Sequence, residues 1–305
     1  PIIHSAMAKC QDEIMPLNLL LSYALTTQKD LDVIAKTTPP DTKIIIDSGA
    51  FTAFKTGKEV TLKGYAKFLI DISFIPYGYI NLDIIGDPAA SMRNYKLMVK
   101  MGFNPVPVIT KGGSVDEFDE YAKAPFVALG GLVGAMTSRN EKIGWIDKCV
   151  HAANKHNIKL HLLGLTSPKL LMRWPIASAD SSSWDSSARY GSFSLYKGGG
   201  RMLSFDRSDV KNKIQNDPHL KMLVKQHGAS PYELIEESNW RGGGSLNAAI
   251  SARAYIKYSN DFERTTGKKL FIAAVGSRAP VVIDQYKKEQ EGEYVSSDFV
   301  VGRTR

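Results

Sequence analysis

The sequence predicts an α/β protein, a (β/α)8 TIM barrel with an elaborated insertion late in the chain. Short apolar runs rich in β-branched residues recur along the 305 residues, and a longer segment with helical periodicity follows each of them. The runs are apolar almost throughout, which is typical of parallel strands covered on both faces. Seven such runs, with an eighth expected, fit a barrel better than an open doubly wound sheet.

Seven of the predicted strands precede the insertion. They span residues 18–24, 43–47, 79–84, 105–109, 126–130, 159–163 and 176–180. The eighth strand is either 192–196 or 270–274. We favour 270–274, which makes residues 181–269 an insertion within a single domain spanning residues 1–305.

Start and stop signals place helices between the strands. Asp87 followed by Pro88 is typical of an N-cap with proline at the first helical position, and Gly102 ends that helix. Ser167 and Pro168 repeat the start signal. Alternation of strands and helices is the pattern that a parallel barrel requires.

The insertion differs in composition from the rest of the chain. It contains two glycine-rich basic segments, KGGGR and WRGGGS. Residues 196–305 hold 18 basic and 13 acidic side chains and so contribute five of the net charge of +8. This balance favours a polyanionic partner. Lys197, Arg201 and Arg241 are therefore candidate phosphate contacts, although the glycines are equally typical of flexible connections.

The two cysteines, Cys10 and Cys149, are far apart and form no CxxC or CxC pair, so we expect neither a disulfide framework nor a metal site. The N-terminus does not resemble a signal peptide, and the longest apolar stretch is too short to span a bilayer. We expect a cytoplasmic protein with no cofactor and no membrane partner. The sequence contains no GxSxG, Walker A, GxGxxG or HExxH motif.

Three predicted strands end in an aspartate or are closely followed by one, namely Asp47, Asp83 and Asp180. The carboxyl ends of barrel strands share one face, so these side chains converge at one mouth. Converging carboxylates suggest glycosyl chemistry, in which one attacks C1′ and another moves protons. A lone Asp after a strand is otherwise a turn former or N-cap, which is our interpretation of Asp87, although Asp87 could replace Asp83 in reading a base.

The motifs occur in the order DSGAF, LDxxGD, ALGGLVG, LHLLGLTSPKLL and ASADSSSW, over residues 43–184. In this order they resemble the tRNA-guanine transglycosylase superfamily. Its members exchange guanine for a 7-deazaguanine on a TIM barrel, through a covalent sugar–enzyme intermediate. The resemblance implies that Asp180 is the nucleophile and that Asp47 is the acid/base group. It also implies a set of base-binding residues, which are Ser48, Phe51, Asp83, Gly130, Gly131 and Leu132.

The chain departs from the tRNA enzymes in two respects. It lacks the cysteines that hold their structural zinc, and Val108, Ile109 and Thr110 offer no amide where those enzymes place a base-contacting Gln. A shortened, zinc-free relative is similar to the phage and bacterial DpdA-type 7-deazaguanine DNA transglycosylases. The resemblance therefore favours DNA and a free preQ0-like base as partners, in the host cytoplasm if a phage encodes the chain.

Several alternatives stay open on the sequence alone. The chain could act on tRNA, or it could be a catalytically silent nucleic-acid-binding subunit, and homodimer formation is not decided. His161 is interpreted as a core or mouth-lining residue rather than a metal ligand. Trp184 and Trp240 are either base-stacking or packing residues, and packing is the commoner fate of tryptophan.

Overall fold

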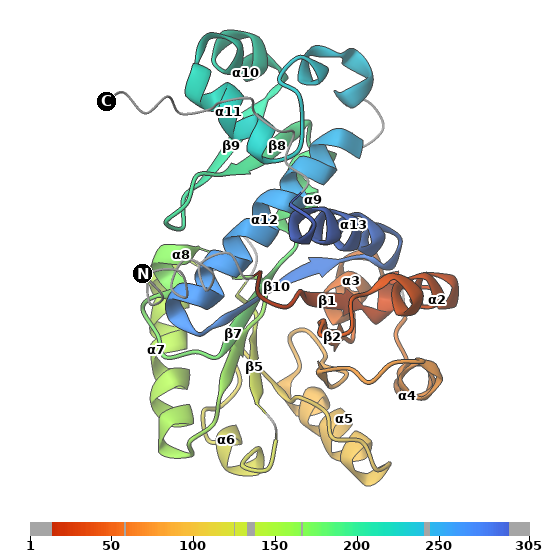
Figure 1. Cartoon of the computed structure of the whole chain (residues 1–305). Helices are drawn as coiled ribbons and strands as arrows, with labels where there is room; N and C mark the ends of the chain where they lie inside the picture. Colours follow the sequence, from red (N-terminus) through yellow and green to blue (C-terminus); the bar gives the residue numbers. More distant parts are fainter. Residues whose placement is uncertain are drawn as a thin grey trace, which may run out of the picture. The chain divides into compact units, whose positions relative to one another are not determined.

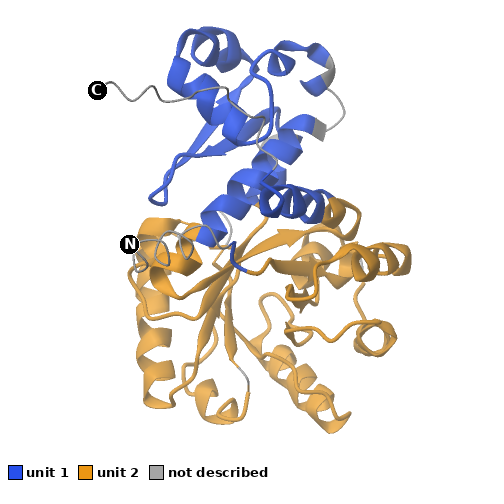
Figure 2. Ribbon diagram, viewed as in Figure 1, with its two compact units in different colours: residues 1–15, 183–260, 281–305 blue, residues 16–182, 261–280 orange. Residues whose placement is uncertain are grey.

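The computed structural model describes residues 14–57, 59–124, 126–132, 138–165, 167–240 and 245–292. The chain divides into two compact units (Figure 2). Residues 16–182 and 261–280 form the first, which we call the sheet unit. Residues 183–260, with described residues from both chain ends, form the second, which we call the hairpin unit.

Eight parallel strands form one curled sheet in the sheet unit (Figure 1), which confirms the predicted α/β class. The strands are β1 Asn18–Ser22, β2 Lys43–Asp47, β3 Gly78–Tyr79, β4 Val108–Thr110, β5 Val127–Gly130, β6 Leu160–Leu162, β7 Ser178–Ser181 and β10 Lys269–Ala274. Their order is β3-β2-β1-β10-β7-β6-β5-β4, in which β10 lies between the first and seventh strands. The favoured eighth strand, 270–274, is therefore confirmed.

The two edge strands, β3 and β4, are linked by one isolated parallel bridge between Ile80 and Val106, so a closed ladder is not shown in the described chain. The buried Asn81 side chain continues this seam. Its Oδ1 accepts a hydrogen bond from the Val108 N–H at 2.9 Å, and its Nδ2 donates to the Ser91 carbonyl at 3.2 Å. The Asn81 side chain thus adds a hydrogen bond to the two backbone hydrogen bonds of the bridge, Val106 N–H to the Tyr79 carbonyl and Asn81 N–H to the Val106 carbonyl.

The helices of the sheet unit follow the strands. They are α2 Gln28–Thr37, α3 Ala50–Thr56, α4 Leu62–Asp71, α5 Pro88–Lys100, α6 Glu117–Glu120, α7 Arg139–Lys155 and α8 Pro168–Leu171, with the 3-10 turns η1 Tyr23–Leu25 and η5 Gly276–Arg278. Asp87 caps α5, because its Oδ1 accepts from the Ala90 N–H at 2.8 Å and Pro88 stands at the first helical position. The N-cap interpretation of Asp87 is confirmed.

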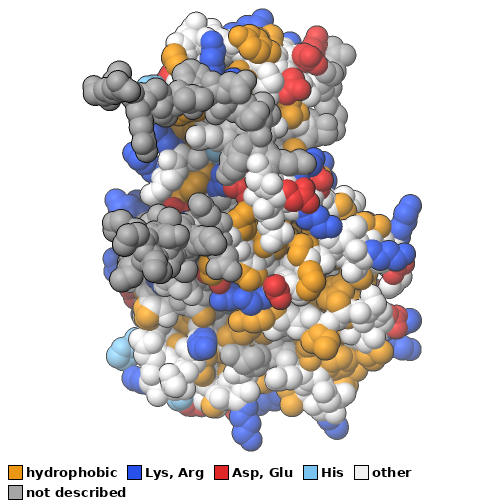
Figure 3. Space-filling model, in the orientation of Figure 1, with side chains coloured by type: hydrophobic (Ala, Val, Ile, Leu, Met, Phe, Trp, Pro, Cys, Tyr) orange, Lys and Arg blue, Asp and Glu red, His pale blue; other side chains and the backbone are white. Residues whose placement is uncertain are grey.

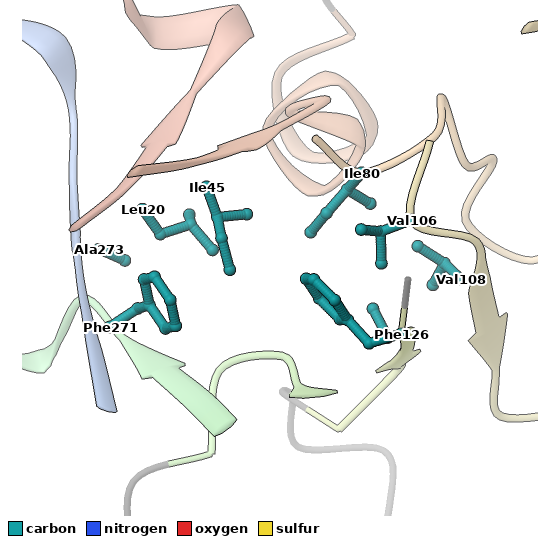
Figure 4. Close-up of a cluster of buried hydrophobic side chains, with 9 residues drawn as sticks. Leu20, Ile45, Ile80, Val106, Val108, Phe126, Phe271 and Ala273 are labelled. Carbon is teal, nitrogen blue, oxygen red and sulfur yellow. The ribbon is translucent and has the colours of Figure 1, made fainter. Parts of the chain in front are cut away.

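A buried apolar cluster fills the interior of the curled sheet (Figure 4). It consists of Leu20, Ile45, Ile80, Val106, Val108, Phe126, Ala128, Phe271 and Ala273. These side chains come from β1, β2, β4, β5 and β10 and from residues near β3, β4 and β5, and the labelled ones point toward one another in Figure 4. Because side chains alternate along a strand, residues two positions further along also face the interior.

The hairpin unit has its own apolar core around β8 and β9, which includes Phe193, Phe205 and Val224. Its elements are α9 Ser183–Arg189, β8 Ser192–Tyr196, β9 Met202–Asp206, α10 Arg207–Asn212, η2 Ile214–Asn216, α11 Pro218–Gln226, η3 Glu233–Ile235 and η4 Glu237–Trp240. Two further helices, α12 Ser245–Thr266 and α13 Ala279–Gln290, have residues in both units. Strand β8 pairs antiparallel with β9, so residues 192–196 are not the eighth strand of the large sheet.

No helix in the described ranges combines the length and the apolar composition needed to cross a membrane.

Candidate active site

The alternation of strand residues brings two of the predicted aspartates to the interior of the sheet. Ile45 belongs to the interior cluster, and Asp47 follows it by two residues at the carboxyl end of β2. Asp180 on β7 is in register with Phe271, another member of that cluster. The charges of Asp83 and Asp180 both act on Asp47. The structure therefore brings the three aspartates together, as the strand ends predict.

Asp47 is the site's proton-holding group. Burial of its carboxyl raises its pKa from 3.8 to about 7, with the negative charges of Asp83 and then Asp180 adding to the rise. The Gly49 N–H donates to Asp47 Oδ2 at 2.9 Å and opposes it. At neutral pH both forms of this carboxyl are populated, which suits a group that gives and takes a proton.

Asp83 is buried and follows the short strand β3. The Ser48 hydroxyl donates to its Oδ1 at 2.9 Å, so the neighbouring residue of the DSGAF motif holds this carboxyl in place. Burial raises the pKa of Asp83 to about 6, and the Ser48 hydrogen bond works in the opposite direction. The Ser48 hydroxyl thus holds one of the two carboxyl oxygens of Asp83.

The glycine of DSGAF is required by its backbone and its surroundings. Gly49 has φ +80°, and a Cβ at this position would come within 2.4 Å of the Ala24 Cβ. Gly49 is also the N-cap of α3, so the chain turns from β2 into the helix at this residue. The turn aims Ser48 at Asp83 and places the Gly49 N–H on Asp47.

Tyr65 on α4 ties the ends of β2 and β3 together beneath the acids. Its buried hydroxyl donates to the Ile80 carbonyl at 2.7 Å and lies 3.4 Å from the Ile46 carbonyl. Burial, followed by the charges of Asp47 and Asp83, raises the pKa of this phenol well above its usual value. Tyr65 therefore stays neutral, and its hydroxyl links the backbone that follows β3 to the end of β2.

Asp180 is buried and accepts two hydrogen bonds on one oxygen. The Gly164 N–H lies 2.9 Å from Asp180 Oδ1, and the His161 Nε2 lies 3.2 Å from the same atom. The sequence interpretation of His161 as an interior residue agrees with its zero exposure. Its contact with Asp180 was not predicted.

Close packing and backbone conformation explain why glycine occupies positions 130 and 131 at the end of β5. A Cβ on Gly130 would lie 3.0 Å from the Val108 side chain, and Gly131 has φ +70° with Lys111 N 3.1 Å from a built Cβ. Leu132 is buried. The close approach of these residues to a heterocycle stays a prediction.

Phe51 lies on α3, one residue beyond the Asp47 to Ala50 turn, and is 43% exposed. The Lys55 Nζ lies 4.5 Å from the centre of its ring. An exposed ring is available for stacking on a base. Its stacking role stays a prediction.

The predicted phosphate contacts belong to the hairpin unit. Lys197 and Arg201 are exposed and flank the turn between β8 and β9, where the Lys197 N–H donates to the Arg201 carbonyl at 2.9 Å. The intervening glycines all have positive φ, so the turn itself explains them. Arg241 lies outside the described residues. On the face of the molecule that Figure 3 shows, the coloured Lys and Arg side chains are dispersed and do not gather in one patch.

Two tryptophans that could have stacked on bases are packing residues instead. Trp184 has no exposed surface. The Trp240 Nε1–H donates to the Leu234 carbonyl at 2.8 Å, and its ring packs against Phe193. The packing interpretation of both is confirmed.

Among the described residues no three His, Cys, Asp or Glu side chains form a cluster that could hold a metal ion. Cys149 is buried, and burial raises the pKa of its thiol to about 12. No protein-family model matches the chain, and no curated protein matches its sequence.

Proposed function

We propose that the chain is a pentosyltransferase that replaces guanine in DNA with a preQ0-like 7-deazaguanine through a covalent Asp180–deoxyribosyl intermediate. The observation that supports this most is the pairing of two different acids at the carboxyl ends of parallel strands. Asp180 is held by two donors, and Asp47 holds a proton near neutral pH. Two carboxyls with different surroundings can take different roles, in which one attacks and the other transfers protons.

In the first step, Asp180 Oδ2 attacks C1′ of the target nucleotide while the bond from C1′ to N9 of guanine breaks. The electron pair of that bond stays on guanine, and the protonated Asp47 supplies the proton that makes guanine a neutral leaving group. In the second step, the incoming 7-deazaguanine gives its N9 proton to the Asp47 carboxylate. N9 then bonds to C1′, and the Asp180 carboxylate is released.

Asp83 is the residue that we assign to reading the base. Guanine and 7-deazaguanine both present N1–H and a 2-amino group as donors, and a carboxylate is the acceptor that such an edge needs. The Ser48 hydroxyl occupies Asp83 Oδ1, so Oδ2 is the oxygen for the base. Phe51 would cover the flat face of the ring.

A buried C1′ cannot be attacked inside a stacked duplex, so the target nucleotide must turn out of the helix. The basic hairpin-unit residues Lys197, Arg201 and Arg241 are our candidates for holding the flanking phosphates. Hydrogen bonds to phosphates carry no base information, so these contacts would position DNA without choosing its sequence.

The test is base incorporation by the purified full chain. Radiolabelled guanine or preQ0 is offered with duplex DNA, with single-stranded DNA and with bulk tRNA, and Asp180→Asn is the matched control. We expect label in DNA from the unmodified chain only, and a covalent adduct on Asp180 by mass spectrometry when no incoming base is present. Label in tRNA alone would favour the tRNA reading, and nucleic-acid binding without label in any substrate would favour a silent subunit.

A further inference from the structure

His161 on β6 lies between the aromatic rings of Phe126 and Phe271, with ring centres 6.1 Å and 5.8 Å away. Both phenylalanines belong to the interior cluster, so the imidazole lies inside the curled sheet with no exposed surface. Each ring nitrogen nevertheless has a polar partner. Nδ1 lies 2.8 Å from Ser178 Oγ, and Nε2 lies 3.2 Å from Asp180 Oδ1.

The chemistry of the partners determines which nitrogen holds the hydrogen. An ionised carboxylate can only accept hydrogen bonds, so the Nε2 that faces Asp180 must be the protonated nitrogen. In a neutral imidazole Nδ1 is then an acceptor, and the Ser178 hydroxyl donates to it. The Asp180 carboxylate therefore selects the tautomer of His161, and the Ser178 hydroxyl, which can donate or accept, satisfies Nδ1 and holds the ring in place.

We propose that Ser178 and His161 are positioning residues for the nucleophile, an inference that rests on the proposed function. The Ser178 hydroxyl donates to Nδ1 of the Nε2–H tautomer and holds the His161 ring in place. The His161 Nε2–H and the Gly164 N–H then hold Asp180 Oδ1, which fixes the plane of the carboxylate and leaves Oδ2 for C1′.

The burial of Asp180 explains why two donors are needed. The residue is 6% exposed, so water can solvate the charge only weakly, and hydrogen bonds from the protein must replace the lost solvation. If His161 took the other tautomer, the Nε2 lone pair would face the carboxylate oxygen. The nucleophile would then lose one donor and gain a repulsive contact.

The chain contains a matched control for the tautomer. His227 in the hairpin unit is also buried, but its Nδ1 donates to the Leu223 carbonyl at 2.7 Å and its Nε2 accepts from the Tyr196 N–H at 3.0 Å. Burial lowers the pKa of His227 to about 4, so this imidazole is neutral. The two buried histidines are expected to be opposite tautomers.

The first experiment is nitrogen NMR of the full chain labelled with 15N-histidine, at neutral pH. We expect His161 as the Nε2–H tautomer and His227 as the Nδ1–H tautomer, with Ser178→Ala changing the His161 signals alone. An Nδ1–H form or an imidazolium at His161 would overturn the assignment. This measurement does not depend on activity, so it decides the hydrogen bonds even if the protein exchanges no base.

The second experiment is single-turnover formation of the Asp180–sugar adduct. We expect Ser178→Ala to slow it about 10-fold and His161→Leu about 100-fold, as for loss of hydrogen bonds to a charged group, with DNA affinity unchanged. Ser178→Thr keeps the hydroxyl and His161→Gln keeps a donor toward Asp180, so each should restore most of the rate.

Thermal melts show whether each variant folds. If His161→Leu does not fold, the NMR spectrum and adduct formation of Ser178→Ala still decide the proposal. Unchanged adduct formation in folded Ser178→Ala and His161→Leu would refute the positioning role. Absence of exchange in the unmodified chain would refute the proposed function instead, while the NMR result would still stand.

Discussion

Asp47→Asn is expected to make the protein more stable at alkaline pH while abolishing base exchange. The pKa of Asp47 lies at about 7 in the folded chain against 3.8 for an ordinary aspartate, so between these values the folded state binds the proton that the unfolded state has lost. Stability from this group is therefore present at low pH and is lost as pH rises through about 7. Asn carries no charge at any pH, so the Asp47→Asn variant does not lose stability as the pH rises through this range.

The size of the effect follows from the pKa change. A rise from 3.8 to about 7 corresponds to about 4 kcal/mol at about 1.4 kcal/mol per pKa unit. Asp47 is half-buried, and solvent screening reduces this figure, so we expect the variant to gain about 1–3 kcal/mol over the unmodified chain at about pH 8. At about pH 5 only the unfolded state has lost this proton, so roughly two-fifths of the gain should remain, and the gain should reach zero only below about pH 3.8.

The assay is urea unfolding of both proteins at a series of pH values, with Asp41→Asn as the control. Asp41 is an exposed aspartate in the turn before β2, and its replacement should leave the difference between the two pH values unchanged. A stability difference for Asp47→Asn that does not grow with pH, or that has the opposite sign, would refute the assignment of Asp47 as a proton-holding group. Base incorporation is measured on the same samples.

Three further outcomes are expected. Asp180→Asn should lose exchange by several orders of magnitude and still bind DNA, because only nucleophilicity is removed; near-normal label incorporation would contradict this. Asn81→Leu should destabilise the protein by about 2–3 kcal/mol and speed hydrogen exchange at the Val108 amide, since that buried N–H loses its acceptor; unchanged protection there would exclude a role in the seam. Replacing Lys197 and Arg201 together by Gln should weaken binding of all DNA sequences alike and flatten its salt dependence, and an unchanged salt slope would place the DNA-binding surface elsewhere.

The sequence predicts the strands of the large sheet well because each is a short, nearly continuous apolar run. It fails at the seam, where the predicted strand at 105–109 shortens to Val108–Thr110. Pro105 and Pro107 lack the N–H that a ladder requires, and the Asn81 side chain adds a hydrogen bond at this seam. Prolines in a predicted strand indicate that it lies at the edge of a sheet. They do not indicate which side chain hydrogen-bonds to the backbone of that edge strand.

The aspartates of the site were accessible to sequence reasoning because they end strands, and Asp47 also follows the interior Ile45 by two residues. The Ser178 and His161 pair was not, although alternation from Asp180 places Ser178 on the same face of β7. The missing information is the register between β6 and β7, where His161 lies opposite Ser178. Register across parallel strands depends on their helical connection, which a single sequence does not fix.

The place of β10 in the sheet has a consequence for biosynthesis. This strand pairs with β1 on one side and β7 on the other, so residues roughly 250 apart in sequence become neighbours only when it arrives. Until residue 274 has left the ribosome, β1 and β7 each present an unpaired edge, and within the described chain the strands β3-β2-β1 and β7-β6-β5-β4 are joined only through the Ile80–Val106 bridge. The nascent chain must therefore keep both edges from pairing with other strands while residues 183–268 are being synthesised.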